Sequence, residues 1–200
     1  MTWKSGEKFA IVIVGDEFTH GESAEQNGPW IARQLVNYGF VVDLCIQLSD
    51  NPESLGYWLN QILNGPIDHI IVSGGIGGTH DDYTRQSIAA ALDIPIAVHR
   101  DCLKILEQKY AGRLNDQRRR MAYLPLGSTL IDNPQGAPGF QVANFTALPG
   151  FPRMVKTMLP ELLAQSSGQN NSMICTKAYF SDRTEGDIAV QVEEFFELWS

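Results

Sequence analysis

Short apolar runs and helix-like segments alternate along the first half of the chain. Continuous apolar runs, typical of strands buried on both faces of a parallel sheet, occupy residues 9–14, 40–46 and 67–72. Each run leads through a polar or glycine-rich loop into a segment with helical character, over residues 27–38, 53–63 and 79–92. The repeated order of strand, loop and helix predicts an α/β domain with a mostly parallel sheet and right-handed crossovers.

The second half is less regular but keeps both kinds of element. We expect helices over residues 98–110 and 152–164, a short helix within 111–121, and strands over 128–131 and 140–148. Pro160 should kink or split the helix that contains it, because proline removes a helical hydrogen bond.

The last part of the chain forms a unit of its own in this interpretation, with a strand over residues 173–180 and an amphipathic helix over 184–198. A segment of this size is too small to bury a separate core. We therefore predict a main domain, residues 1–165, and a strand–helix appendage, residues 172–200. The apolar face of the appendage helix should pack on the domain or on a neighbouring subunit.

Composition and charge restrict the partners. The chain has 200 residues and a formal net charge of −8, which disfavours a nucleic-acid partner. No apolar run approaches the roughly 18 residues of a membrane-spanning helix. The polar N-terminal residues lack the apolar core of a signal peptide. Three well-separated cysteines indicate free thiols in a reducing compartment, so we expect a cytoplasmic protein.

A glycine-rich turn at the end of the third apolar run is the strongest candidate for chemistry. Four glycines, Gly74, Gly75, Gly77 and Gly78, separate this strand from the helix predicted to begin at Thr79 or Asp81. Such a turn exposes backbone N–H groups beside a helix N-terminus, an arrangement that favours anions. The simpler alternative is a tight strand–helix turn without a ligand.

Acidic residues in the same region point to a cation. Asp81 and Asp82 lie within the glycine turn, and Thr79 and Asp82 have the spacing of a capping box. Bare carboxylates repel phosphate, so a bridging cation such as Mg²⁺ reconciles the acids with the glycines. Asp16 follows the first strand, at the edge of an open sheet where ligands bind.

The motifs together resemble the molybdopterin-binding (MoaB/Mog-like) domain family, over residues 9–163. The chain is most similar to the branch that includes the CinA N-terminal domain and the molybdopterin-binding-like domain of FAD synthases. The matching stretches are Gly-Asp-Glu at 15–17, Asn27 before the first helix, Asp50 in an acidic loop, the glycine turn at 74–84, Gly-Ala-Pro-Gly at 136–139 and Leu-Pro-Gly-Phe-Pro at 148–152.

The resemblance implies a three-layer α/β/α domain that self-associates as a dimer or trimer, and a start of a second domain in the appendage. It implies that Asp50 and Asp82 serve Mg²⁺-dependent (or other divalent) chemistry, with Asp81 and Asp16 as secondary metal candidates. The implied ligand is a pterin or an adenine nucleotide. The residues expected to bind it are Gly74, Gly75, Gly77, Gly78, Thr79, Thr84, Gly136, Pro138, Gly139, Pro149 and Gly150.

Three hypotheses for function remain open at this stage. The first is an enzyme acting on a phosphoanhydride, either a nucleotidyltransferase of the molybdenum cofactor type or a CinA-type pyrophosphatase on ADP-ribose or FAD-like dinucleotides. The second is a non-catalytic pterin- or nucleotide-binding module, which the departures from the family motif at Glu25-Gln26 and Arg153 favour; Gly78, in place of the family's proline, is a further departure. The third is an interaction scaffold with a vestigial pocket. We also expect Gly75→Val to remove ligand binding while the fold stays largely intact.

Overall fold

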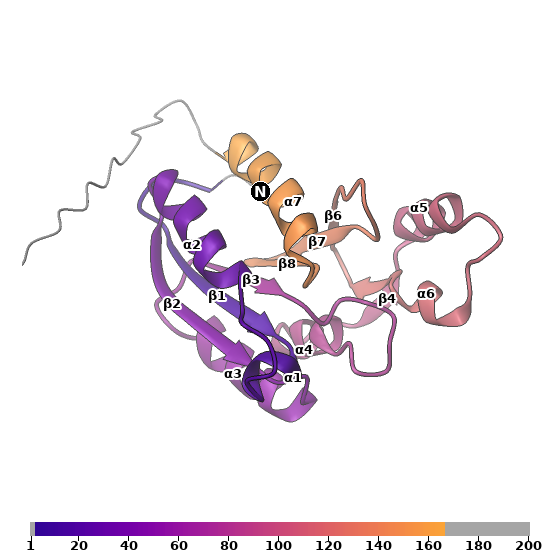
Figure 1. Ribbon diagram of the computed structural model, residues 1–200, viewed down its shortest axis with the longest axis horizontal. Coiled ribbons are helices and arrows are strands. Elements are labelled where there is room, and N and C mark those ends of the chain that lie inside the picture. The colour runs from indigo at the N-terminus through magenta and orange to yellow at the C-terminus, as the bar shows by residue number, and fades with distance from the viewer. Residues whose placement is uncertain (1–2, 167–200) are drawn as a thin grey trace, which may run out of the picture.

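A six-stranded sheet forms the centre of the protein (Figure 1). The computed structural model describes residues 3–166. The strand order is β2-β1-β3-β8-β7-β6. The strands are β1 (Lys8–Val14), β2 (Val41–Leu48), β3 (His69–Ser73), β6 (Thr129–Ile131), β7 (Gly139–Val142) and β8 (Phe145–Leu148). Strands β2, β1, β3 and β8 are parallel, whereas β7 and β6 are antiparallel to their neighbours. The predicted α/β class with a mostly parallel sheet is confirmed.

Helices cover both faces of the sheet and complete three layers. Helices α2 (Asn27–Asn37) and α7 (Pro152–Ser166) lie on one face, and α3 (Pro52–Leu63) and α4 (Thr84–Ala91) lie on the other (Figure 1). The short helix α1 (Asp16–Thr19) follows β1. The appendage predicted at residues 172–200 lies outside the described residues. The predicted division into a main domain and an appendage therefore stays a prediction.

A small lobe, residues 96–125, stands to one side of the central sheet. It contains the antiparallel pair β4 (Ile96–Val98) and β5 (Tyr123–Pro125) and the helices α5 (Arg100–Tyr110) and α6 (Asp116–Arg120) (Figure 1). The prediction missed this two-stranded sheet, because strands of three residues are too short to show a period. The helix predicted from residue 98 begins at Arg100, and the His99 ring accepts a hydrogen bond from the Cys102 N–H at 3.2 Å.

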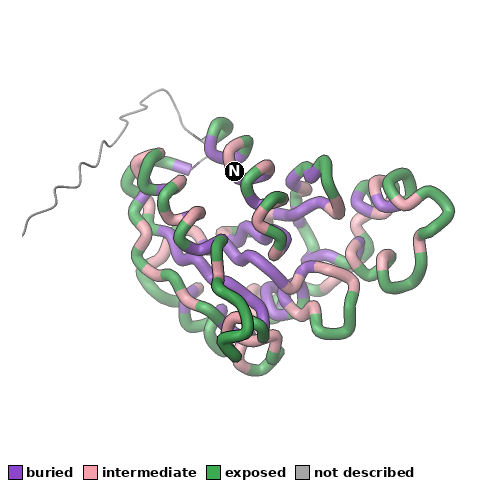
Figure 2. Tube along the Cα trace, viewed as in Figure 1, coloured by how far each residue is buried: buried purple, intermediate pink, exposed green. Residues whose placement is uncertain are grey.

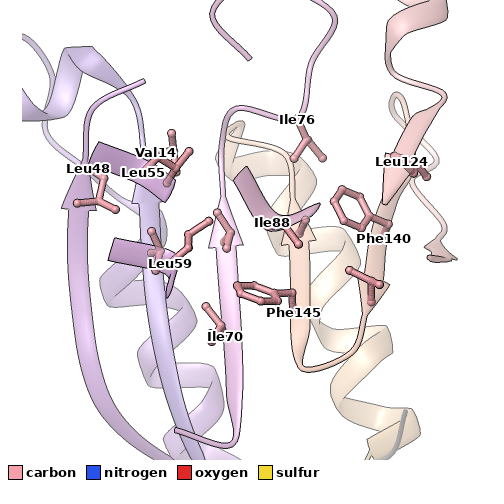
Figure 3. Packing of buried hydrophobic residues seen from close by; sticks show 14 of the residues in the cluster. Val14, Leu48, Leu55, Leu59, Ile70, Ile76, Ile88, Leu124, Phe140 and Phe145 are labelled. Carbon is pink, nitrogen blue, oxygen red and sulfur yellow. The ribbon is translucent and has the colours of Figure 1, made fainter. Parts of the chain in front are cut away.

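Burial on both faces explains the continuous apolar run of the first strand. Phe9, Ile11 and Ile13 pack with α2 and α7, whereas Ala10 and Val12 pack with α3 and α4. The buried strands run through the centre of the tube in Figure 2, between helices with exposed outer faces. Figure 3 shows one of the two clusters, in which side chains from α3 and α4 meet those of the strands.

The strand predicted over residues 140–148 is wrong as a single element. The chain reverses at Ala143, so that β7 and β8 form a hairpin with Val142 opposite Phe145. Ala143 takes a left-handed conformation with φ 48°, which turns usually assign to glycine or asparagine. The sequence therefore lacks the usual hairpin signal at this point. Helix α7 runs unbroken past Pro160 to Ser166, so the predicted split does not occur.

The two cysteines in the described part of the chain are free thiols, as predicted. Cys45 is exposed and Cys102 is buried. Burial raises the pKa of the Cys102 thiol to about 11, so that this thiol is protonated and unreactive at neutral pH. Within residues 3–166 no helix is long and apolar enough to cross a membrane.

Candidate functional site

The carboxyl ends of the parallel strands meet at one edge of the sheet. The N–H of Gly15 donates to the Leu48 carbonyl at 3.0 Å, and the N–H of Gly74 donates to the Leu148 carbonyl at 3.0 Å. These bonds join the loops that follow β1, β2, β3 and β8. A cavity of about 660 Å³ opens between the loops. Most of the predicted site residues line it, namely Asp50, Gly74, Gly75, Gly77, Gly78, Thr79, Asp81, Asp82, Gly136, Pro149 and Gly150.

Two acids after β1 and β2 hold each other in place. The N–H of Asp16 donates to the Asp50 carboxylate at 3.0 Å, and the N–H of Asp50 donates back to the Asp16 carboxylate at 3.0 Å. Burial raises the pKa of Asp50, the hydrogen bond from the Asp16 N–H opposes this, and the charges of Asp16, Asp81 and Glu17 raise it further. Negative charge is therefore concentrated around Asp50, which a cation would relieve.

Asp82 fastens the glycine turn. Its carboxylate accepts hydrogen bonds from the N–H of Gly77 at 2.9 Å, the N–H of Thr79 at 2.7 Å and the Thr79 hydroxyl. The predicted pairing of Thr79 with Asp82 is thus present, but within a turn. The predicted helix start at Thr79 or Asp81 is wrong, because these bonds close a loop and α4 begins only at Thr84.

The glycines of the turn are required by the packing around them. Gly74 and Gly75 have φ 110° and 65°, and a Cβ at either position would lie under 3.0 Å from an atom of Val14 or Thr84. The expectation that Gly75→Val leaves the fold largely intact is therefore wrong. Gly78 replaces the proline of the family motif, and a Cβ there would overlap the backbone carbonyl of Gln117 in α6.

Four predicted site residues do not line the cavity. Thr84 is buried, and its hydroxyl donates to the Gly74 carbonyl at 2.8 Å. Gly139 allows close strand packing, because a Cβ there would lie 2.5 Å from the Ala147 carbonyl oxygen. Pro138 is buried, and the Asp16 carboxylate supports Asp50 from outside the cavity wall. These residues shape the loops around the cavity.

Asn27 is the first residue of α2, and its side chain joins two of the loops. Its side-chain amide donates to the Ser73 hydroxyl at 3.1 Å and to the Gly150 carbonyl at 2.7 Å. The Ser73 hydroxyl donates to the Pro149 carbonyl at 3.0 Å. Glu25, which sequence reasoning treated only as a departure from the family, satisfies the start of α2 through the N–H groups of Asn27 and Gly28.

We expect Asn27→Ala to lower the free energy of unfolding by about 1–3 kcal/mol, because it removes a hydrogen-bond partner from the buried Ser73 hydroxyl and from the half-buried Gly150 carbonyl. Urea unfolding followed by circular dichroism measures the change. Asn37→Ala, at an exposed position of the same helix, is the matched control and should change the stability by less than about 0.5 kcal/mol. Equal effects of the two variants would mean that the Asn27 bridge contributes nothing.

An apolar wall of the cavity was not predicted from the sequence. It comprises Phe18, Tyr110, Met121, Phe151 and Met154, and the Phe151 side chain is 65% exposed. Such residues suit a flat ring. The one available signal was Phe151, an aromatic residue between glycine and proline in a loop, where a large exposed apolar side chain needs a partner.

Comparison with known proteins decides the family. Residues 10–167 match a family described as "Probable molybdopterin binding domain". The chain belongs to this molybdopterin-binding domain family. The resemblance inferred from the glycine turn and the late loops is confirmed, together with the fold that it implies.

Relatives of this molybdopterin-binding domain include Protein PF0476 of Pyrococcus furiosus, which is 32% identical over 94% of the chain and 81% of the relative. A Metallosphaera sedula protein is 34% identical over 76% of the chain, which spans 61% of that protein. A solved structure titled as the protein CinA with unknown function, from Thermoplasma acidophilum, superimposes with a TM-score of 0.73 at 27% identity, over 80% of this chain and 97% of that one.

The tungsten cofactor synthesizing protein MoaB of Pyrococcus furiosus has the same fold. Its TM-score is 0.53 at 18% identity, over 80% of this chain and 92% of that one. Both branches named by the resemblance, CinA and MoaB/Mog, are therefore among the structural neighbours.

Proposed function

We propose that the cavity binds a pterin or an adenine nucleotide through its phosphate or pyrophosphate group, with Mg²⁺ or another divalent cation at Asp50. The observation that carries this proposal is the concentration of acids, namely Asp16, Glu17 and Asp81, around the half-buried Asp50, beside a glycine turn suited to phosphate. A cation between the acids and the phosphate makes these two features compatible.

The acids around Asp50 suit a cation that is coordinated partly by protein carboxylates and partly by the phosphate oxygens of the ligand. Among residues 3–166 no three His, Cys, Asp or Glu side chains are placed to hold a metal together. Mg²⁺ commonly takes one or two protein carboxylates and fills its remaining positions with phosphate oxygens and water. Asp50 is the first candidate, with Asp81 and Asp16 beside it. Asp82 stays a candidate, but its carboxylate already accepts three hydrogen bonds.

The glycine turn retains donors for phosphate. The backbone N–H groups of Gly75, Ile76 and Gly78 make no hydrogen bond within the described part of the chain, whereas those of Gly74, Gly77 and Thr79 are used internally. N–H groups without a protein partner are suited to phosphate oxygens. The apolar wall around Phe151 would take the ring of the same ligand.

Access of water favours hydrolysis over adenylyl transfer. Glu17, Asp81 and Phe151 line the cavity and are exposed, so that water reaches the position proposed for the phosphate. In the proposed reaction water attacks one phosphorus of a phosphoanhydride and the other phosphate leaves. A divalent cation would supply stabilisation of the charge that develops on the phosphoryl oxygens. This agrees with the pyrophosphatase activity on ADP-ribose that the CinA-like resemblance implies.

A non-catalytic binding module is the second candidate. It is favoured by Arg153, which occupies the position of a family acid, and by the use of Asp82 within the turn. Binding and turnover assays with ATP, ADP-ribose and FAD, each with Mg²⁺ or Co²⁺, separate the candidates. Turnover supports the enzyme, saturable binding without turnover supports the module, and neither contradicts the proposal.

We also propose that the chain self-associates as a dimer or trimer. The small lobe exposes Val98 and Tyr123, which lie opposite each other in the β4–β5 pair, and the exposed Leu126 directly follows the lobe. Their exposures are 43%, 48% and 57%. Adjacent exposed apolar residues of this size favour a protein contact. Light scattering of the purified protein over a range of concentrations tests the oligomeric state.

A further inference from the structure

A second cavity lies on the other side of the glycine turn. Its volume is about 560 Å³, and Thr79 and Asp82 line both this cavity and the first. Arginines from two elements contribute to its wall, namely Arg85 from α4 and Arg119 and Arg120 from α6. None of the residues that we place in the phosphate site, apart from Thr79 and Asp82, belongs to it.

Arg85 is unusual because it is a buried cation with few partners. It is only 2% exposed, and one guanidinium nitrogen donates to the Arg120 backbone carbonyl. Its Nε has no hydrogen-bond partner. In residues 3–166 no carboxylate lies within 4.0 Å of it to form an ion pair. A buried charge normally requires such a partner, so the structure leaves a place for an anion beside Arg85.

The other charged residues of the cavity wall do not form an ion pair with Arg85. The charge of Asp82 acts on Arg85, but the oxygens of Asp82 already accept hydrogen bonds from Gly77 and Thr79. Asp116 lies at the exposed start of α6, and His80 is also exposed. Three arginines therefore face two acids, in a protein whose total formal charge is −8. A local excess of positive charge in an acidic protein indicates selective attraction of anions.

We propose that this cavity, the arginine cavity, is a second anion site that binds a phosphate or phosphate monoester group. A guanidinium group presents its N–H donors in a planar fork that matches two phosphate oxygens. The ammonium group of lysine is a point charge without this planar geometry. Arg85 supplies the buried donor, and Arg119 and Arg120 approach from the exposed side. The site requires no metal, so it is independent of the function proposed for the first cavity.

Titration of inorganic phosphate by calorimetry, with EDTA present to remove divalent cations, tests the proposal. Wild-type protein should bind phosphate, and Arg119→Gln and Arg120→Gln should each weaken the affinity at least about fivefold, because each removes a charge-assisted contact. Both residues are exposed, so the fold should survive these changes. Arg100→Gln, an exposed change in α5 outside the cavity, is the matched control and should bind as wild type does.

The same titration with AMP identifies the source of the phosphate group. If AMP binds and responds to Arg119→Gln, the site takes a nucleotide monoester; if only inorganic phosphate does, the site takes free phosphate. Arg119→Gln and Arg120→Gln should leave the Mg²⁺-dependent affinity for ADP-ribose unchanged, because neither residue lines the first cavity, and this separates the two sites. Absence of saturable binding up to about 10 mM phosphate, or equal affinities in wild type and both arginine variants, would overturn the proposal.

Discussion

Alanine at Gly74 should lower the free energy of unfolding by roughly 3 kcal/mol or more, which is a large part of the stability of a domain of this size. Gly74 has φ 110°, a conformation that side chains rarely adopt. Its Cβ would also overlap the backbone carbonyl of Val14 at the end of the neighbouring strand. Because the obstacle is backbone within the sheet, no side-chain rotation relieves it.

Urea unfolding of Gly74→Ala measures this loss, with Gly56→Ala as the matched control. Gly56 lies within α3, and a Cβ there would meet nothing within 4 Å. Alanine at Gly56 should therefore leave the stability unchanged or raise it by about 0.5–1 kcal/mol, since alanine favours the helix. A Gly74→Ala protein as stable as wild type would show that the strand ends tolerate a wider spacing than the structure has.

Asp50→Asn should reduce Mg²⁺-dependent ligand affinity at least about tenfold while the fold stays intact. Asparagine keeps the shape of the side chain and an oxygen that can accept from the Asp16 N–H, but it loses the charge that attracts a hard cation. Asp43→Asn, at an exposed position of β2 outside the cavity, is the matched control. Its affinity should equal that of wild type.

The same substitution should also change the dependence of stability on pH. The pKa of Asp50 is higher in the folded protein than its ordinary value of 3.8, so proton binding favours the folded state. This contribution is fully present below the ordinary pKa and is lost as the pH rises through the folded pKa. Asparagine does not titrate, so the Asp50→Asn protein does not lose stability through this group as the pH rises. At neutral pH its free energy of unfolding should be equal to or higher than that of wild type. Lower stability would show that Asp50 serves the fold.

Sequence reasoning predicted the elements whose signal is local. The runs that became β1 and β3 are continuous, apolar and buried, which is typical of central strands. The run that became β2 was also expected to be buried on both faces, but β2 lies at the sheet edge and alternates exposed with half-buried residues. The hairpin at Ala143 was missed because its left-handed residue is an alanine. The start of α4 was placed early because Thr79 and Asp82 have the spacing of a cap, and only the fold shows that their bonds close a turn.

The candidate site was predicted only where its residues form local motifs in the sequence. Motif order located the glycine turn and Asp50, which meet at the carboxyl ends of β3 and β2, on either side of β1. The sequence could not show that Asn27 bridges two loops, because its partners Ser73 and Gly150 are distant along the chain. The burial of Arg85 was equally invisible, since an arginine after Thr84 looks like an exposed helix residue.

We propose that a divalent cation joins the acids at Asp50 to a phosphate-bearing ligand. Calorimetric titration of ADP-ribose into wild type and Asp50→Asn, at several Mg²⁺ concentrations, tests it most directly. We predict that the affinity of wild type rises with Mg²⁺ and that the affinity of Asp50→Asn, at saturating Mg²⁺, is at least about tenfold weaker. Equal Mg²⁺ dependence in the two proteins would contradict the claim.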